Sequence, residues 1–104
     1  MTFRKYKYME GKRMEIMHNN TRIWMVDDNR NEIASVDFPK VGDRTFNIHS
    51  VDVAPEYRNQ GIGEDLLERT YNFLKENKRN AIVTCSFAKK WFDEHPEHKD
   101  ICQK

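Results

Sequence analysis

The sequence lacks the features that mark membrane, secreted and disulfide-rich proteins. No apolar run approaches the roughly 20 residues that a membrane helix requires, and the segment from Met1 to Tyr6 has no apolar stretch of the secretory type. Cysteine occurs only as Cys85 and Cys102, which make a poor disulfide framework. We therefore expect a cytoplasmic protein with free thiols, while a Cys85–Cys102 bridge stays open from sequence alone.

An excess of charge of one sign is also missing. The 104 residues carry 18 Lys and Arg against 17 Asp and Glu, a formal net charge of +1. This balance gives no general attraction to nucleic acid or to an anionic membrane, and no basic stripe with aromatic platforms is present. We expect neither as a partner. His95 and His98 have no further Cys/His spacing beside them, so we expect no metal site.

Repeats, low-complexity tracts and Pro/Gly linkers are absent, and the length and composition predict one domain over residues 1–104. The first half reads as strands separated by turns, after a charged, frayed N-terminus. The segment Asp28-Asn29-Arg30-Asn31 is a strong turn signal, because Asp and Asn side chains bond their own backbone. The four strands are expected at about 12–18, 21–27, 32–38 and 45–53.

The apolar spacing changes after these strands. From Gly61 to Lys78 the apolar residues recur every three or four positions, which predicts a helix. A short apolar strand follows at 81–85, and Ser86 can cap a second helix that stops near His95-Pro96. Its expected apolar face holds Phe87, Ala88, Trp91 and Phe92. We predict an α+β domain with a mixed, mostly antiparallel sheet, in which the strand–helix–strand unit at 45–85 forms a parallel pair.

The junction between the fourth strand and the first helix contains two closely spaced glycines, Gly61 and Gly63. A helix N-terminus presents unpaired N–H groups and a positive dipole end, and glycines there let an anion such as pyrophosphate approach. Arg58 can add a charged donor. A P-loop does not fit, because Glu64-Asp65 follow the second glycine, and a dinucleotide fingerprint does not fit, because Leu66 stands at its third glycine. The alternative is a turn that merely begins a helix.

The stretch from Val53 to Gly63 resembles the acetyl-CoA signature of the GNAT-type N-acetyltransferases. That signature is Arg or Gln, two residues, Gly, one residue, then Gly or Ala, between a strand and a helix. Arg58, Gly61 and Gly63 match it, as does the preceding Val-x-Pro. The resemblance implies a GNAT-like fold and an acyltransferase that uses acetyl-CoA (coenzyme A) as co-substrate.

The resemblance also implies how coenzyme A would be held. The N–H groups of the glycine turn would hold its pyrophosphate, and the strand at 51–53 would pair with the pantetheine arm. A backbone N–H at or near Val53 would polarise the thioester carbonyl. The implied binding residues are Val51, Val53, Arg58, Asn59, Gln60, Gly61, Ile62 and Gly63.

Two motifs near the C-terminus resemble the minimal branch of that family, whose members are about as long as these 104 residues. They are Cys85-Ser86-Phe87 and His95-Pro96-Glu97. The branch implies a role for Cys85 beside the thioester or as a nucleophile, against the plain reading of a small residue at a strand end. The strand histidine of the branch is displaced here: His49 lies one residue early, which turns a side chain to the opposite face.

Three functional readings stay open from the sequence. The first is transfer of acetyl to a small or protein amine by a monomer or weak dimer, with His49, Asp52, Glu56 or His95 as the base. The second is a non-catalytic acyl-CoA-binding module, because so short a chain leaves little room for an acceptor. The third is a thiol-exchange protein that uses Cys85.

Overall fold

The computed structural model describes residues 5–9 and 11–103. Eleven elements follow one another within these described residues. In order they are β1 (Lys5–Met9), β2 (Lys12–His18), β3 (Arg22–Val26), β4 (Glu32–Asp37), β5 (Thr45–Ile48), β6 (Ser50–Val53), η1 (Pro55–Tyr57), α1 (Ile62–Glu76), β7 (Asn80–Val83), α2 (Ser86–Glu94) and η2 (Pro96–Ile101).

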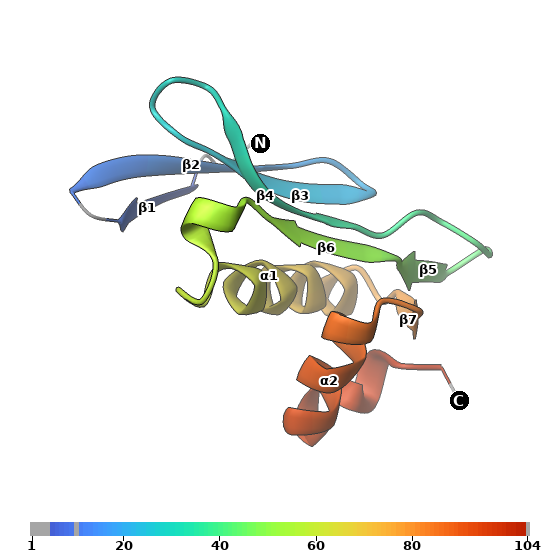
Figure 1. Ribbon diagram of the computed structural model, residues 1–104. Helices are drawn as coiled ribbons and strands as arrows, with labels where there is room; N and C mark the ends of the chain where they lie inside the picture. Colours follow the sequence, from blue (N-terminus) through green and yellow to red (C-terminus); the bar gives the residue numbers. More distant parts are fainter. Residues whose placement is uncertain (1–4, 10, 104) are drawn as a thin grey trace.

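The strands form two sheets. The larger has the order β1-β2-β3-β4-β6, and each neighbouring pair is antiparallel. The smaller pairs β5 with β7 in parallel. Figure 1 shows α1 running along one face of the larger sheet, with α2 and η2 beyond it beside β7. The predicted α+β class, the antiparallel first half and the parallel strand–helix–strand unit are confirmed.

The strand expected at 45–53 is divided at His49. Before that point β5 pairs with β7, and after it β6 pairs with β4 instead. The backbone N–H of His49 donates to the carbonyl of Asp37 at 2.9 Å, while the N–H groups of Thr84 and Cys85 both donate to the carbonyl of Ile48, at 3.1 and 3.3 Å. The parallel ladder therefore ends at Ile48, and the two strands separate.

The N-terminal strand β1 differs from the frayed terminus expected from sequence. Its residues pair with β2 in register, from Lys5 opposite Ile16 to Met9 opposite Lys12. The Nζ of Lys7 also lies 3.3 Å from a carboxylate oxygen of Asp65 on α1. A polar, charged segment gives little apolar periodicity, so pairing with an existing strand, rather than local pattern, forms β1. The part of the expected terminus at 1–4 lies outside the described residues.

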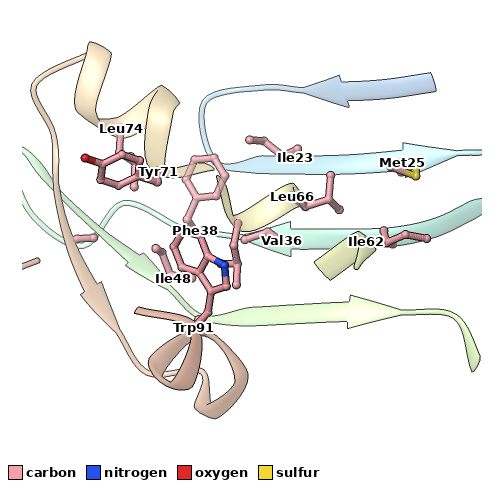
Figure 2. Packing of buried hydrophobic residues seen from close by; sticks show 14 of the residues in the cluster. Ile23, Met25, Val36, Phe38, Ile48, Ile62, Leu66, Tyr71, Leu74 and Trp91 are labelled. Carbon is pink, nitrogen blue, oxygen red and sulfur yellow. The ribbon is translucent and has the colours of Figure 1, made fainter. Parts of the chain in front are cut away.

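The core lies between α1 and the inner face of the larger sheet (Figure 2). The helix buries Ile62, Leu66, Leu67, Tyr71 and Leu74, at the three- and four-residue spacing that predicted it. On the sheet side the largest fully buried side chains are Phe38, Met14 and Met25. No helix within residues 5–9 and 11–103 is both long and apolar enough to cross a bilayer.

The second helix follows the prediction only in part. It ends at Glu94 with His95 as its C-cap, close to the expected stop, and it buries Ala88, Trp91 and Phe92. Cys85, rather than Ser86, is the N-cap residue. Phe87 was expected on the apolar face, but it is 44% exposed and its ring lies against Gly63 at the start of α1.

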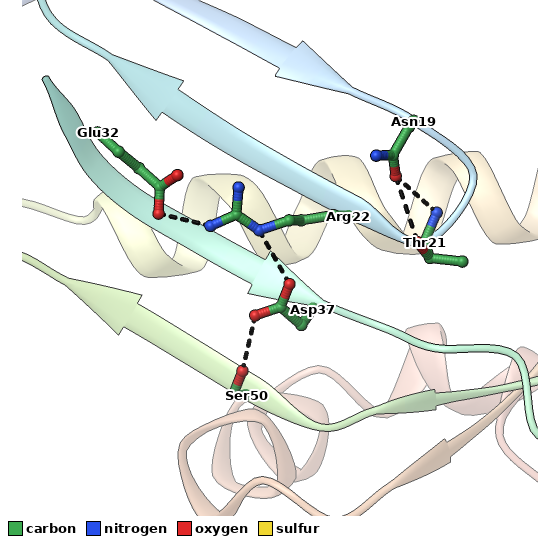
Figure 3. Close-up of polar contacts among 6 residues, drawn as sticks. All are labelled: Asn19, Thr21, Arg22, Glu32, Asp37 and Ser50. Atoms are coloured by element: carbon green, nitrogen blue, oxygen red, sulfur yellow. Dashed lines mark hydrogen bonds and ion pairs between the residues drawn. The ribbon is translucent and has the colours of Figure 1, made fainter. Parts of the chain in front are cut away.

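The face of the larger sheet opposite α1 carries a polar network (Figure 3). Arg22 donates to a carboxylate oxygen of Glu32 and, at 2.9 Å, to Asp37. The hydroxyl of Ser50 donates to the other oxygen of Asp37 at 3.1 Å. These side chains stand on β3, β4 and β6, so the network joins three neighbouring strands on the side away from the core.

The turn between β3 and β4 confirms the predicted turn signal. One carboxylate oxygen of Asp27 accepts the backbone N–H groups of Asn29 and Asn31, at 2.9 and 2.8 Å. The hydrogen bond from the Asn31 backbone is the main reason that the pKa of Asp27 lies below its ordinary value. The ionised carboxylate is therefore favoured by folding.

We expect Asp27→Asn to lower the thermal midpoint at pH 7, because the neutral amide is a weaker acceptor for these N–H groups. A pKa that folding lowers adds stability above the unfolded value of about 3.9, and this contribution is lost as the pH falls through the folded value. The gap between the two proteins should therefore close below about pH 4 in circular dichroism melts. Asp28→Asn is the matched control, and a gap that stays constant with pH would contradict the assignment.

Candidate functional site

In the part of the chain that the structure describes, β6 has one free edge, since it lies at the end of the larger sheet and pairs only with β4. The N–H of Ala54 donates to the carbonyl of Ile33 at 2.8 Å, across to β4. The direction of backbone hydrogen bonds alternates from one residue to the next along an antiparallel strand. The N–H groups of Val51 and Val53 consequently face away from β4, along the free edge.

This edge leads directly into the start of α1 (Figure 1). The chain passes through η1 and then through Asn59 and Gly61, whose φ angles of 64° and 78° are left-handed. Gly61 is the N-cap and supplies no side-chain cap, and the first helical bond runs from the N–H of Asp65 to its carbonyl at 3.0 Å. The N–H groups of residues 62–64 have no partner within the helix, so they form a site for an anion.

A pocket of about 260 Å³ joins the free edge to the helix start. Gln60 does not line it. The lining does include seven of the eight residues that the sequence predicts for coenzyme A, namely Val51, Val53, Arg58, Asn59, Gly61, Ile62 and Gly63. It also includes residues that the prediction of binding residues did not contain, namely Asp52, Tyr57, Glu64 and Phe87.

The two glycines of the turn are needed for different reasons. Gly61 has a left-handed backbone, with open space where a side chain would lie. A Cβ on Gly63 would instead lie 3.1 Å from two ring carbons of Phe87 and 3.4 Å from a methyl carbon of Val51. The first turns of α1 and α2 thus touch through Gly63 and Phe87, and this contact closes one side of the pocket.

The two residues predicted to be catalytic lie outside the lining of this pocket. Cys85 is the N-cap of α2, half-buried against the core and joined through its N–H to the carbonyl of Ile48. It stands two residues before Phe87, which does line the pocket. His49 is exposed at the break between β5 and β6. The structure places both at the point where the strands separate, next to the pocket rather than in it.

The disulfide that the sequence left open does not form, because both thiols are free. Cys102 forms an isolated bridge with Ala81, at the start of β7. Cys85 comes four residues after Ala81, about 13 Å along an extended chain. A disulfide requires Cα atoms within about 7 Å, so the fold keeps the two cysteines apart.

Residues 20–101 match the sequence profile of the GCN5-related N-acetyl-transferase family. The chain belongs to this family. A search of curated protein sequences finds no match.

Solved structures of the family share the fold. A GCN5-like protein from Staphylococcus aureus is 28% identical and superposes with a TM-score of 0.71, over 86% of this chain and 87% of its own. An acetyltransferase of the GNAT family from Staphylococcus aureus Mu50 is 15% identical, with a TM-score of 0.58 over 72% of this chain and 50% of its own. The spermidine/spermine N-acetyltransferase SpeG from Vibrio cholerae is 18% identical, with a TM-score of 0.54 over 78% and 51%. The chain thus spans about half the length of these two larger proteins.

The charges around the pocket of this GCN5-related protein are nearly balanced. Arg58 brings a cation, while Asp52 and Glu64 bring carboxylates. The neighbouring Asp65 is offset by Lys7 and Arg69, at 3.3 and 3.4 Å. Attraction for an anion therefore rests on the backbone N–H groups and the helix dipole together with Arg58, not on an excess of basic side chains.

The histidines of the C-terminal motif have structural contacts. The Nδ1 of His95 lies 2.7 Å from the carbonyl of Trp91, and its ring stacks on the indole at 4.6 Å. The Nε2 of His98 lies 2.7 Å from a carboxylate oxygen of Glu68 on α1. Within residues 5–9 and 11–103, no group of three or more His, Cys, Asp or Glu side chains could hold a metal ion. His95 is thus the cap residue between α2 and η2.

Sequence reasoning missed Phe87 and Glu64 as parts of the pocket. Phe87 was placed in the core, because helical spacing groups it with the buried face of α2. Glu64 was used only to exclude a P-loop. One signal was present: an aromatic residue in the first turn of a helix directly after a strand end is well placed to border a site at that end.

We expect Gly63→Ala to gain less than the roughly 1 kcal/mol that alanine ordinarily adds over glycine in a helix, because its methyl group crowds the ring of Phe87 at 3.1 Å. Phe87→Ala should relieve most of this crowding, which a double-mutant cycle in urea unfolding would measure as a coupling of about 1 kcal/mol or more. Gly61→Ala is the control: its cost of about 1–2 kcal/mol is backbone strain, which Phe87→Ala leaves unchanged. Equal coupling at both glycines would disprove the contact.

Proposed function

We propose that this chain is an N-acetyltransferase that moves an acetyl group from acetyl-CoA to an amine. One observation carries the proposal: the donors of the free β6 edge and the unpaired N–H groups of α1 open into one pocket. A ligand with an anion at one end and a carbonyl at the other matches that order of donors. Membership of the GCN5-related family, whose members are N-acetyltransferases, points to acetyl-CoA as that ligand.

In this proposal the pyrophosphate of coenzyme A lies against the N–H groups of residues 62–64, with Arg58 beside it. The pantetheine arm runs along the free edge of β6 and first passes Val53, the residue nearer the turn, whose N–H can pair with it. The ring of Phe87 lines the pocket and forms an apolar wall against the arm. The thioester carbonyl then meets the N–H of Val51, which lies farther from the turn.

Acetyl transfer follows from this placement. The neutral amine attacks the thioester carbonyl, and the negative charge that develops on its oxygen is stabilised by the N–H of Val51. The carbon–sulfur bond breaks, the acetyl group stays on nitrogen, and the coenzyme A thiolate leaves and takes up a proton. Holding the thioester on a fixed strand edge reduces the motion that must be lost in the transition state.

The base that removes the amine proton is assigned to Asp52. Of the candidates from sequence, Asp52 alone lines the pocket, whereas His49, Glu56 and His95 do not. Its side chain alternates with those of Val51 and Val53 and so lies on the face of β6 opposite α1. An amine arriving over the polar face of the sheet would pass this carboxylate.

A non-catalytic acyl-CoA-binding module is the second candidate, and one observation favours it. The chain spans about half the length of two of the larger family members that it superposes on. The polar face that carries Arg22, Asp37 and Ser50 is partly exposed, and these three residues line neither the pocket at β6 nor the one beside β7. Release of free coenzyme A only in the presence of an amine separates transfer from plain binding.

We expect calorimetric titration with acetyl-CoA to give a dissociation constant in the micromolar range, roughly 1 μM to 1 mM. Gly61→Glu should weaken binding by at least about tenfold, because a carboxylate then stands at the anion site. Gly11→Glu is the matched control, since Gly11 has nearly the same φ, 76° against 78°, and the same open space, but lies in the β1–β2 turn. Equal affinity in all three proteins, or no binding by the wild type, would contradict the proposal.

The role of Cys85 distinguishes two routes of acetyl transfer, one covalent and one direct. If its thiolate attacks the thioester, coenzyme A leaves first, and an acetyl-Cys85 intermediate then passes the group to the amine. Because the side chain lies beside the pocket rather than in it, we expect direct transfer: Cys85→Ala should keep kcat within about threefold, with Cys102→Ala as control. In the same assay Asp52→Asn should lower kcat more than His49→Ala. Mass spectrometric detection of an acetylated Cys85, together with loss of turnover in Cys85→Ala, would establish the covalent route instead.

A further inference from the structure

The segment after α2 places one histidine between two carboxylates. The Nε2 of His98 lies 2.7 Å from a carboxylate oxygen of Glu68 on α1, and its Nδ1 lies 3.3 Å from a carboxylate oxygen of Glu97 on η2. The side chain of His98 is only 15% exposed. Its Nδ1 is buried and makes no hydrogen bond within residues 5–9 and 11–103, so its contact with Glu97 depends on charge.

The imidazole of His98 also has aromatic neighbours on two helices. Its ring centroid lies 4.1 Å from that of Tyr71 on α1 and 5.2 Å from that of Trp91 on α2. The ring therefore stands where α1, α2 and η2 meet. A change in the charge of this one side chain acts on the packing of all three elements.

The number of contacts that His98 can satisfy depends on its protonation. A neutral imidazole has one N–H, so it donates to one carboxylate while its other nitrogen presents a lone pair to the second. An imidazolium has two N–H groups and a positive charge, so it attracts Glu68 and Glu97 together. Histidine is the side chain whose charge ordinarily changes between about pH 5 and 8. Acidification within this range should therefore tighten the packing of η2 on α1.

The other ionisable groups at this junction were considered for their charge. Asp100 accepts a hydrogen bond from Tyr71 at 2.9 Å and lies 2.9 Å from the Nζ of Lys75. The hydrogen bond from Lys75 is the main reason that the pKa of Asp100 lies below its ordinary value, so this pair stays charged and balanced. His95 is the one nearby cation that would oppose a charge on His98, but their ring centroids are 5.7 Å apart, farther than either carboxylate contact.

The junction is connected to the pocket by α2 itself. This nine-residue helix ends at Glu94, and the N–H of His98 donates to the carbonyl of His95 at 2.8 Å, so η2 follows it closely. At the opposite end of α2, the ring of Phe87 lies against Gly63 and lines the pocket. The helix is thus held on α1 at both ends, and the contact at the far end restrains the ring at the near end.

We propose that His98 is a pH-sensitive positioning residue: its protonated ring, held by Glu68 and Glu97, docks η2 on α1 and thereby steadies the Phe87 side of the pocket. The docking itself is independent of what the pocket binds. Its effect on the pocket rests on the proposed acetyl-CoA site. His98 does not line the pocket, so it acts only through α2.

The first test is amide hydrogen exchange of residues 97–101 in the full chain, at about pH 5.5 and pH 8, corrected for the intrinsic rate at each pH. Protection in the wild type should be about threefold or more higher at the lower pH, as expected for a partly buried ion pair. His98→Gln keeps a donor for Glu68 but cannot take up a charge, so its ratio should be close to one. The matched control is His18→Gln, an exposed histidine on β2 that should keep the wild-type ratio.

Glu97→Gln is a second variant, which serves even if His98→Gln does not fold, because the Glu97 side chain is 62% exposed. It should lose the pH response as His98→Gln does, whereas Glu94→Gln, an exposed carboxylate at the end of α2, should retain it. A merely structural role of His98 would lower protection equally at both pH values. An equal pH response in the wild type, His98→Gln and Glu97→Gln would overturn the inference.

The second test is the dissociation constant of acetyl-CoA from calorimetry at the same two pH values. The phosphates of the ligand also titrate, so each variant is compared with the wild type at one pH. His98→Gln should bind about threefold or more weakly at pH 5.5 and nearly equally at pH 8. A pH response of η2 without this difference in affinity would overturn the link to the pocket. Absence of binding by the wild type would overturn the proposed function, while hydrogen exchange would still decide the docking.

Discussion

The rest of the site depends on the hydrogen bonds that the carbonyl of Ile48 accepts. This carbonyl accepts two N–H groups, from Thr84 and Cys85, and so ends the parallel ladder between β5 and β7. Beyond it the chain turns at His49 and pairs with β4. A strand has two edges, and β6 has used one of them on β4. Its other edge is not paired with β7, so the backbone N–H groups along that edge need another hydrogen-bond partner.

That free edge becomes a binding site only because a helix begins at its end. The turn through Asn59 and Gly61 reverses the chain, so that the N-terminus of α1 points back at the pocket. Arg58 then links the turn to Val53. Donors from a strand edge, a helix end and a guanidinium thus lie in one continuous surface, although each arises from a different part of the backbone geometry.

The position of α2 depends on contacts at the C-terminus. The ring of His98 packs on the ring of Tyr71, with centroids 4.1 Å apart, and its Nε2 contacts Glu68. The hydroxyl of Tyr71 donates to Asp100 at 2.9 Å. These contacts dock η2 on α1, and η2 follows α2 directly. The Phe87 ring that borders the pocket is therefore held in place from the far end of its helix as well as by Gly63.

The site shows which of its features can be predicted from a short stretch of sequence and which cannot. The order Arg58, Gly61, Gly63 between a strand and a helix was enough to predict a helix-end anion site, since these residues are contiguous and their geometry is local. The sequence did not indicate that Gly63 is required by Phe87, because the two residues meet only when α2 folds back on α1. The same applies to the bond from Arg58 to Val53, since nothing in the motif says where the side chain points.

The sequence by itself determined the succession from strands to helix, strand and helix, the helical face of α1 and the turns at 28–31 and at Gly61. These follow from hydrophobic period and from backbone torsions that few residues adopt. Tertiary structure decided three other things: that β1 joins the sheet, that the 45–53 segment breaks at His49, and that Phe87 leaves the core. Each depends on which distant backbone satisfies a hydrogen bond or which distant surface is near, and such contacts are not encoded within any single segment.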